Sequence, residues 1–116
     1  MAIYGGDGQL KSRIVVNVSG VASVNIDLKK DENAFIDIFL HSGSQVTTSF
    51  NFLNPPECGE INIFVSNLSG GVRNATFITG ITGGNGSLSS IPNNGTRFCK
   101  IVQISGIYAF QSANWI

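Results

Sequence analysis

The amino-acid sequence predicts an all-β protein: a single antiparallel β-sandwich, jelly-roll-like, or a barrel of about eight strands, with almost no helix. Three observations lead to this prediction. Apolar and polar residues alternate with period two over most of the chain, and no stretch places apolar residues at helical spacing. The alternating stretches are rich in Val, Ile, Thr and Phe, which suit a pleated surface. Turn residues such as Gly, Pro, Asn and Ser separate these stretches at intervals of about eight to twelve residues.

The alternation places the expected strands at residues 12–19, 23–30, 33–41, 45–52, 60–67, 72–79, 96–105 and 106–111. The third of these, "NAFIDIFLH", is apolar on both faces, because Phe35 and Phe39 lie opposite a row of aliphatic residues. We therefore expect this strand to be central in its sheet or to face a partner.

The stretch "GITGGNGSLSSIPNNG" (80–95) is rich in Gly and Asn, and we expect an exposed loop there with at most one short strand around Leu88 to Ile91. The 116 residues fit one domain. We expect residues 12–116 to form this β domain and residues 1–11, with the flexible "GGDG", to form an N-terminal arm.

The chain carries few charges: 12% of its residues are charged and its net charge is zero, against about 25% charged residues in typical soluble domains. Its surface must therefore be covered by uncharged polar residues or buried against partners. The basic residues are too few for strong phosphate binding, so no nucleic-acid partner is expected. No apolar run is long enough to span a membrane and no signal peptide is recognisable, so we expect synthesis in a cytoplasm and no membrane association.

Cys58 and Cys99 are the two cysteines of the chain, 41 positions apart. A zinc site needs four ligands at recognisable spacing, and with a single histidine these are missing. We therefore expect no metal and no cofactor. Two reduced, buried thiols are favoured over a disulfide, which stays an alternative in an oxidising medium.

No catalytic residue is predicted, and the chain is not expected to be an enzyme. His41 has Asp37 on the same strand face, but the sequence holds no nucleophile motif, and a histidine at a strand end usually bonds to a turn carbonyl. The "GGNG" at 83–86 lacks the lysine and helix of a phosphate-binding loop. Carbohydrate binding stays open, because Tyr4, Tyr108 and Trp115 can stack on a sugar ring.

The second half of the chain has a distinctive order of features. The stretch "GSQVTTSFNFLNPPECGEINIFVSNLSGGVRNATF" is followed by the glycine-rich segment and then by "NNGTRFCKIVQISGIYAFQSANWI". Over roughly residues 43–116 this resembles the small β modules of tailed-bacteriophage virion proteins, which occur in head-decoration (cement) proteins and in tail fibres. The shared features are a proline-containing turn, a glycine-rich hairpin and a closing aromatic strand. No catalytic residue can be transferred from this resemblance.

The resemblance implies a symmetric β protein, expected to be a homotrimer, that is made in the host cytoplasm, sits on a larger assembly and binds the major capsid protein or another virion protein. The first expectation is a capsid decoration protein that stabilises the outer head shell of the virion. The alternative is a tail-fibre or tail-tip module that binds a host surface glycan or receptor. Because aromatic residues are enriched at interfaces, six aromatic residues are the interface candidates: Tyr4, Phe35, Phe39, Tyr108, Phe110 and Trp115. Packing of Tyr108, Phe110 and Trp115 into the domain's own core is the open alternative for the C-terminal three.

Overall fold

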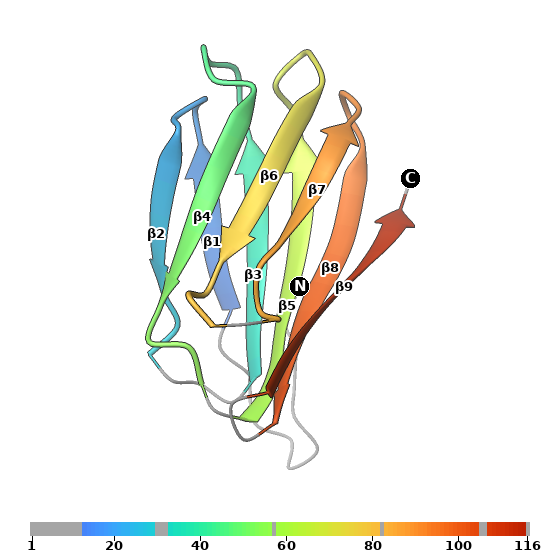
Figure 1. The fold of residues 1–116 in the computed structure, drawn as a ribbon. Coiled ribbons are helices and arrows are strands. Elements are labelled where there is room, and N and C mark those ends of the chain that lie inside the picture. The colour runs from blue at the N-terminus through green and yellow to red at the C-terminus, as the bar shows by residue number, and fades with distance from the viewer. Residues whose placement is uncertain (1–12, 30–32, 57, 82, 105–106, 116) are drawn as a thin grey trace.

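The computed structural model describes residues 13–29, 33–56, 58–81, 83–104 and 107–115 (Figure 1). The described residues form nine strands and no helix, which confirms the predicted all-β class. The predicted arm, residues 1–11, lies outside the described residues. The strands are β1 (Arg13–Val18), β2 (Ser23–Asp27), β3 (Asn33–Leu40), β4 (Thr47–Leu53), β5 (Cys58–Asn67), β6 (Arg73–Ile78), β7 (Gly86–Ile91), β8 (Thr96–Ile104) and β9 (Ile107–Trp115).

The strands form two open sheets that lie face to face (Figure 1). One sheet has five strands in the order β1-β3-β5-β8-β9, and the other has four in the order β2-β4-β6-β7. The thinnest dimension of the domain is 22 Å, as expected of two sheets stacked about 10 Å apart with side chains on their outer faces. Since neither sheet closes on itself, the barrel alternative is wrong.

The prediction of purely antiparallel sheets is also wrong. Strands β1, β3 and β5 pair in parallel, as do β2, β4 and β6, and only the pairings of β7, β8 and β9 are antiparallel. Parallel neighbours need a long crossover connection. Here the crossover is itself a strand of the opposite sheet, because the chain changes sheet after each of the first five strands.

The corners between the sheets stack on one another as the strands do. Beyond the strand ends, the His41 N–H donates to the Val18 carbonyl at 2.6 Å, and the Leu68 N–H donates to the Leu40 carbonyl at 2.8 Å. Gly20, at the corner between β1 and β2, has φ of +64° and lies directly against Gly43, at the corner between β3 and β4. The two are so close that a side chain at either position would clash with the other backbone. The Ser-Gly pairs at 19–20 and 42–43 therefore form tight corners between the sheets, where the predicted antiparallel order called for hairpins.

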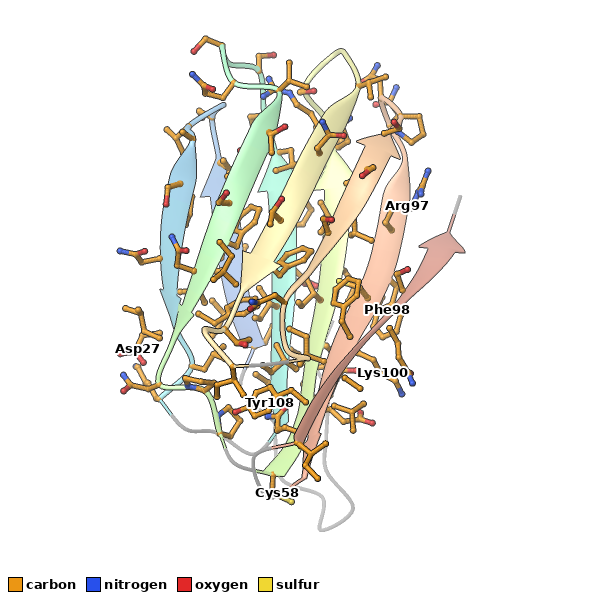
Figure 2. The ribbon with its side chains drawn as sticks, in the orientation of Figure 1. Asp27, Cys58, Arg97, Phe98, Lys100 and Tyr108 are labelled. Carbon is orange, nitrogen blue, oxygen red and sulfur yellow. The ribbon has the colours of Figure 1, made fainter. Side chains whose placement is uncertain are left out.

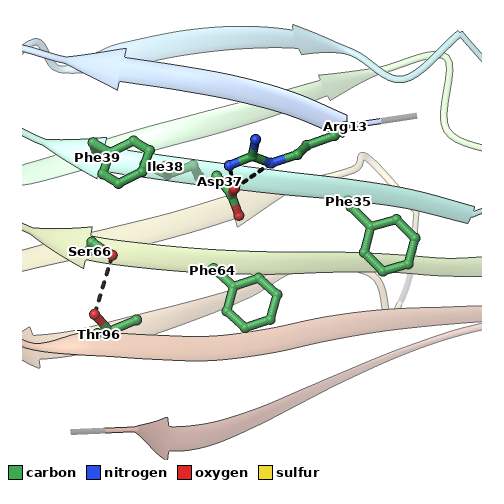
Figure 3. A pocket seen from close by; sticks show the side chains of 8 residues that line it. All are labelled: Arg13, Phe35, Asp37, Ile38, Phe39, Phe64, Ser66 and Thr96. Carbon is green, nitrogen blue, oxygen red and sulfur yellow. Dashed lines mark hydrogen bonds and ion pairs between the residues drawn. The ribbon is translucent and has the colours of Figure 1, made fainter. Parts of the chain in front are cut away.

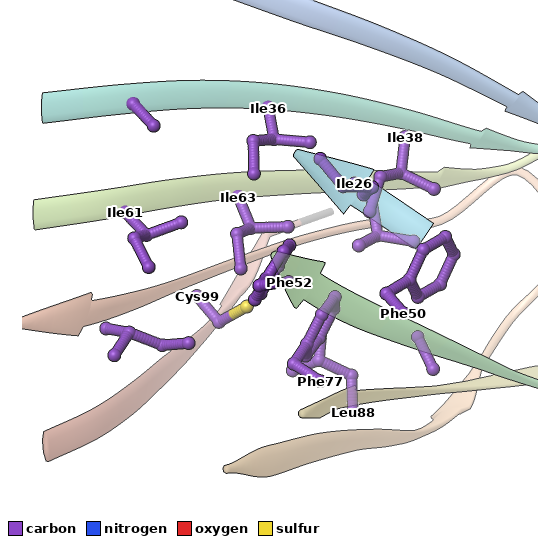
Figure 4. Packing of buried hydrophobic residues seen from close by; sticks show 14 of the residues in the cluster. Ile26, Ile36, Ile38, Phe50, Phe52, Ile61, Ile63, Phe77, Leu88 and Cys99 are labelled. Carbon is purple, nitrogen blue, oxygen red and sulfur yellow. The ribbon is translucent and has the colours of Figure 1, made fainter. Parts of the chain in front are cut away.

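The core lies between the sheets and follows the predicted alternation. In β3 the residues Ala34, Ile36, Ile38 and Leu40 are buried, and the intervening residues face outward. The opposite sheet contributes a cluster of phenylalanines, in which Phe77 stacks on Phe50 and Phe52 with ring centroids 5.6 and 6.0 Å apart (Figure 4). Each of these fully buried side chains contributes about 1.5–3 kcal/mol through its removal from water.

The glycine-rich segment is more ordered than predicted. A strand does run through Leu88 to Ile91, but it begins at Gly86, and Leu88 and Ile91 are core residues. The Asn85 side-chain oxygen accepts the N–H of Thr79 at 2.8 Å and holds the preceding turn. Gly86 lies directly under the ring of Phe110, where any side chain would clash. The glycines therefore make room for aromatic residues of β9 instead of leaving an open loop.

The two cysteines differ from the prediction in one respect. Both are free thiols, and Cys99 is buried in the core, but Cys58 is exposed. In the β5–β8 ladder Cys58 pairs with Ile104 and Cys99 pairs with Ile63. This offset of five residues along the strand is roughly 17 Å, too far for a disulfide.

Alkaline pH is expected to destabilise the fold through Cys99. Burial raises the pKa of its thiol from 9.0 to about 12. Above pH 9 the unfolded chain ionises this thiol and the folded chain does not, so the stabilisation present below pH 9 is lost as the pH rises toward 12. The loss approaches about 1.4 kcal/mol per pH unit. Urea unfolding at pH 8 to 11 should show this slope in the wild type and a shallower slope in Cys99→Ala. Equal slopes would contradict the prediction.

Candidate functional site

The outer face of the five-stranded sheet carries four phenylalanines from three central strands. Phe35 and Phe39 come from β3, Phe64 from β5 and Phe98 from β8, and all four are half-buried. Phe64 and Phe98 are direct cross-strand partners, with ring centroids 4.8 Å apart. We call this surface the phenylalanine face. It exists because each of these residues alternates with a core residue on its strand.

A groove of about 330 Å³ runs across the phenylalanine face (Figure 3). Its walls are mostly apolar, and phenylalanines lie on either side of a short polar row. The lining residues are Arg13, Phe35, Asp37, Ile38, Phe39, Phe64, Ser66 and Thr96.

The polar groups in the groove are paired with one another. Both Arg13 Nε, at 2.7 Å, and Arg13 Nη2 donate to the same Asp37 carboxylate oxygen. The Ser66 and Thr96 hydroxyls are 3.2 Å apart and share a hydrogen bond. A partner that covers this groove would meet a neutral ion pair and not a single charge, which lowers the desolvation cost of binding.

The outer face of the four-stranded sheet has the opposite character. Its side chains are mostly Asn, Ser and Thr, and they bond to one another along the sheet. The Asn51 amide donates to Ser23 Oγ at 2.8 Å and to Asn25 Oδ1 at 3.3 Å, and the Asn74 amide donates to Thr47 Oγ1 at 3.2 Å. This second surface is suited to water, whereas the other outer face carries the phenylalanines. Figure 2 shows the side chains of the domain on both sheets.

The structure places the predicted interface residues in different environments. Phe35 and Phe39 line the groove, as an interface role requires. Tyr108 is buried, and its hydroxyl donates to the Pro56 carbonyl at 2.6 Å. Phe110 packs against the core and stacks on Phe77, with centroids 6.3 Å apart. Tyr108 and Phe110 therefore pack into the core of their own domain, which was the alternative to an interface role.

The remaining two predicted residues are placed only in part. Trp115 pairs with Thr96 at the end of the β8–β9 ladder, so the strand is hydrogen-bonded up to that position. Tyr4 lies outside the described residues.

Sequence reasoning missed Phe64 and Phe98 as site residues. The signal was present, since Phe64 alternates with the core residues Ile63 and Val65, as Phe35 alternates with Ala34 and Ile36. What the sequence did not show is that β3, β5 and β8 are neighbours, and this adjacency brings the four rings onto one surface.

The groups considered for catalysis are separated by their own partners. His41 Nε2 lies 3.0 Å from Asn17 Oδ1, while the Asp37 carboxylate bonds to Arg13. Asp27 accepts the Asn54 amide and the Lys29 N–H, and these bonds lower the pKa of Asp27 below its ordinary value of 3.8. Within the described ranges, no three His, Cys, Asp or Glu side chains gather in a way that would hold a metal ion.

No protein-family model matches this chain, and neither the curated proteins nor the solved structures contain a match to it. In the part of the chain that the structure describes, no helix is long and apolar enough to cross a membrane. The function must therefore be inferred from the surfaces described above.

Proposed function

We propose that this chain is a structural protein of a bacteriophage virion, a capsid decoration protein that binds the outer head shell through its phenylalanine face. One observation carries the proposal: four half-buried phenylalanines and an apolar groove occupy one outer face, while the other outer face is polar and bonded within itself. Contiguous apolar surface on a domain marks an interaction site.

The chemistry of the phenylalanine face fits a binding role better than a reaction. Aromatic residues supply large contact area at protein interfaces, and charged residues are depleted at interface centres. The two charges in the groove neutralise each other, and Lys100 lies 3.5 Å from Glu60 on the same face. The two stacked sheets favour a β-sandwich as the rigid support of this face, although their parallel pairings differ from the antiparallel order of a jelly roll. No enzymatic activity is proposed.

The proposed partner is the major capsid protein or another virion protein, and the proposed location is the capsid surface. The chain acts there as a homo-oligomer, for which the resemblance to phage modules implies a trimer. Each contact is modest, and many copies together brace the shell against internal pressure. Nucleic acid and membranes have no place in this proposal.

A capsid-binding assay tests the proposal. Purified protein should bind expanded phage heads saturably and raise the temperature at which the heads fall apart. Phe64→Lys places a charge in the centre of the phenylalanine face and should weaken binding by at least about thirtyfold, since central aromatic contacts are worth about 2 kcal/mol or more. Ile78→Lys, on the outer face of the four-stranded sheet, is the matched control and should bind as the wild type does.

Two results would overturn the proposal. Binding that is equally weakened by Ile78→Lys would remove the phenylalanine face from its role. Protein that ignores expanded heads and adheres to host cells would support the tail-fibre alternative, in which the ligand is a host surface glycan or receptor.

A further inference from the structure

Strand β9 forms one edge of the five-stranded sheet (Figure 1). Its nine residues, "IYAFQSANW", include no charged residue and no proline. It pairs with β8 over nine consecutive positions without a bulge. On its other side, no strand among the described residues pairs with it.

The other three sheet edges each carry a feature that discourages further pairing. The β1 edge begins with the charged Arg13, and the β2 edge ends with the charged Asp27. The β7 edge is interrupted by a register shift against β6, and Ser90 within it has φ of +55°. Charges, bulges and short lengths are the usual ways in which proteins protect sheet edges. Strand β9 has none of them.

As an edge strand, β9 directs part of its main-chain N–H and C=O groups away from the sheet. In an antiparallel ladder every second residue directs its N–H and C=O toward the neighbouring strand, and the residues between direct theirs to the other side. Apart from Tyr108, whose carbonyl lies against Gly83, the outward groups of β9 thus form a regular row of donors and acceptors. Its side chains add apolar exposure, since Ile107 is 76% exposed.

We propose that β9 pairs with β9 of a second copy of this chain, antiparallel and about a two-fold axis, to join two five-stranded sheets into one. A second copy fits for two reasons. A two-fold axis places the same strand on both sides, so the donors and acceptors of one edge meet those of the other. An uncharged strand can lie opposite itself without the repulsion between like charges that a charged edge would suffer.

The composition of β9 also defines a register. With the axis at the central residue, Gln111 falls opposite Gln111 of the second copy. Ala109 then falls opposite Ala113 of the second copy, and Ile107 opposite its Trp115. At these register positions the strand carries no charged residue, so no like charges lie opposite each other.

This pairing concerns how copies of the chain meet, and it does not depend on what the phenylalanine face binds. It gives an assembly of two chains, whereas the resemblance to phage modules implies three. The two ideas therefore predict different masses for the same purified protein, and failure of capsid binding would leave the β9 pairing untouched.

Sedimentation or light scattering of the wild-type chain at micromolar concentration should give twice the chain mass of 12.3 kDa. Gln111→Glu is nearly isosteric and places two carboxylates at the centre of the pairing. It should raise the dimer dissociation constant by about tenfold or more, and 1 M salt should reverse much of this increase because it screens such repulsion to about 3 Å. Within one chain the new carboxylate faces Lys100, its cross-strand partner, so the fold itself is not opposed.

Asn25→Asp is the matched control, because it makes the same amide-to-carboxylate change on the exposed β2 edge and should leave the dimer unchanged. Hydrogen exchange of the wild type gives a second measure, in which alternate amides of β9 should gain protection as the protein concentration rises. A mass of one or three chains, or β9 exchange that is independent of concentration, would overturn the inference.

Discussion

Phe77→Ala is expected to lower the free energy of unfolding by about 3–5 kcal/mol, the usual cost of removing a fully buried phenylalanine. Phe77 in β6 has no exposed surface and contacts phenylalanines on both sides of the core. It stacks on Phe50 and Phe52 of its own sheet (Figure 4). It also stacks on Phe110 of β9 in the other sheet. Its ring thus joins the two sheets, and its loss leaves a cavity that β-strands fixed in two ladders cannot close.

Denaturant unfolding followed by circular dichroism measures this loss. Ile78→Ala is the control, because Ile78 is the next residue on the same strand but is 36% exposed. That variant should lose no more than about 1 kcal/mol. If Phe77→Ala cost no more than Ile78→Ala, the packing of the two sheets around this ring would be wrong.

Asn67→Leu is expected to cost about 3 kcal/mol, because it leaves several buried backbone groups without partners. Asn67 ends β5 and is fully buried. Its amide nitrogen donates to the carbonyls of Ile91 at 2.8 Å and Gly71 at 2.7 Å, and its oxygen accepts the Ser69 N–H at 3.0 Å. One side chain thus ties together the ends of β5 and β7 and the corner between the sheets.

Gln103→Leu is the matched comparison and should have the opposite sign. Gln103 in β8 is also fully buried, but neither its amide nitrogen nor its oxygen has a hydrogen-bond partner in the part of the chain that the structure describes. Its replacement removes an unsatisfied polar group and should raise the free energy of unfolding by about 1 kcal/mol. Thermal unfolding of both variants tests the pair, and equal destabilisation would contradict the assigned bonding of Asn67.

The positions of the strands could be predicted from the sequence, and their pairing could not. Alternation in "NAFIDIFLH" correctly separates the buried Ile36 and Ile38 from the outward Phe35 and Phe39, because period two is a local property of a strand. Pairing depends on what each turn connects. The "SG" at residues 19–20 serves equally well for a hairpin within one sheet and for a corner between two sheets, and only contact with the next corner at Gly43 decides between them.

The candidate site shows the same limit. The sequence of β3 alone predicts two of the four phenylalanines, Phe35 and Phe39, because this strand is apolar on both faces. Phe64 and Phe98 join them through the β5–β8 pairing, which links residues more than thirty positions apart in the chain. The paired charges of Arg13 and Asp37 likewise become neighbours only through the parallel pairing of β1 with β3. Local patterns predict which side chains face outward, and long-range pairing determines which of them meet.

The direction of the two outermost strands of the five-stranded sheet has a mechanical consequence. Strands β1 and β9 lie at opposite edges and run the same way, since β9 is antiparallel to β8 and β8 is antiparallel to β5. Tension that pulls the start of β1 away from the end of β9 therefore acts lengthwise on the sheet. It must shear whole rows of hydrogen bonds at once, because it cannot peel them apart one after another.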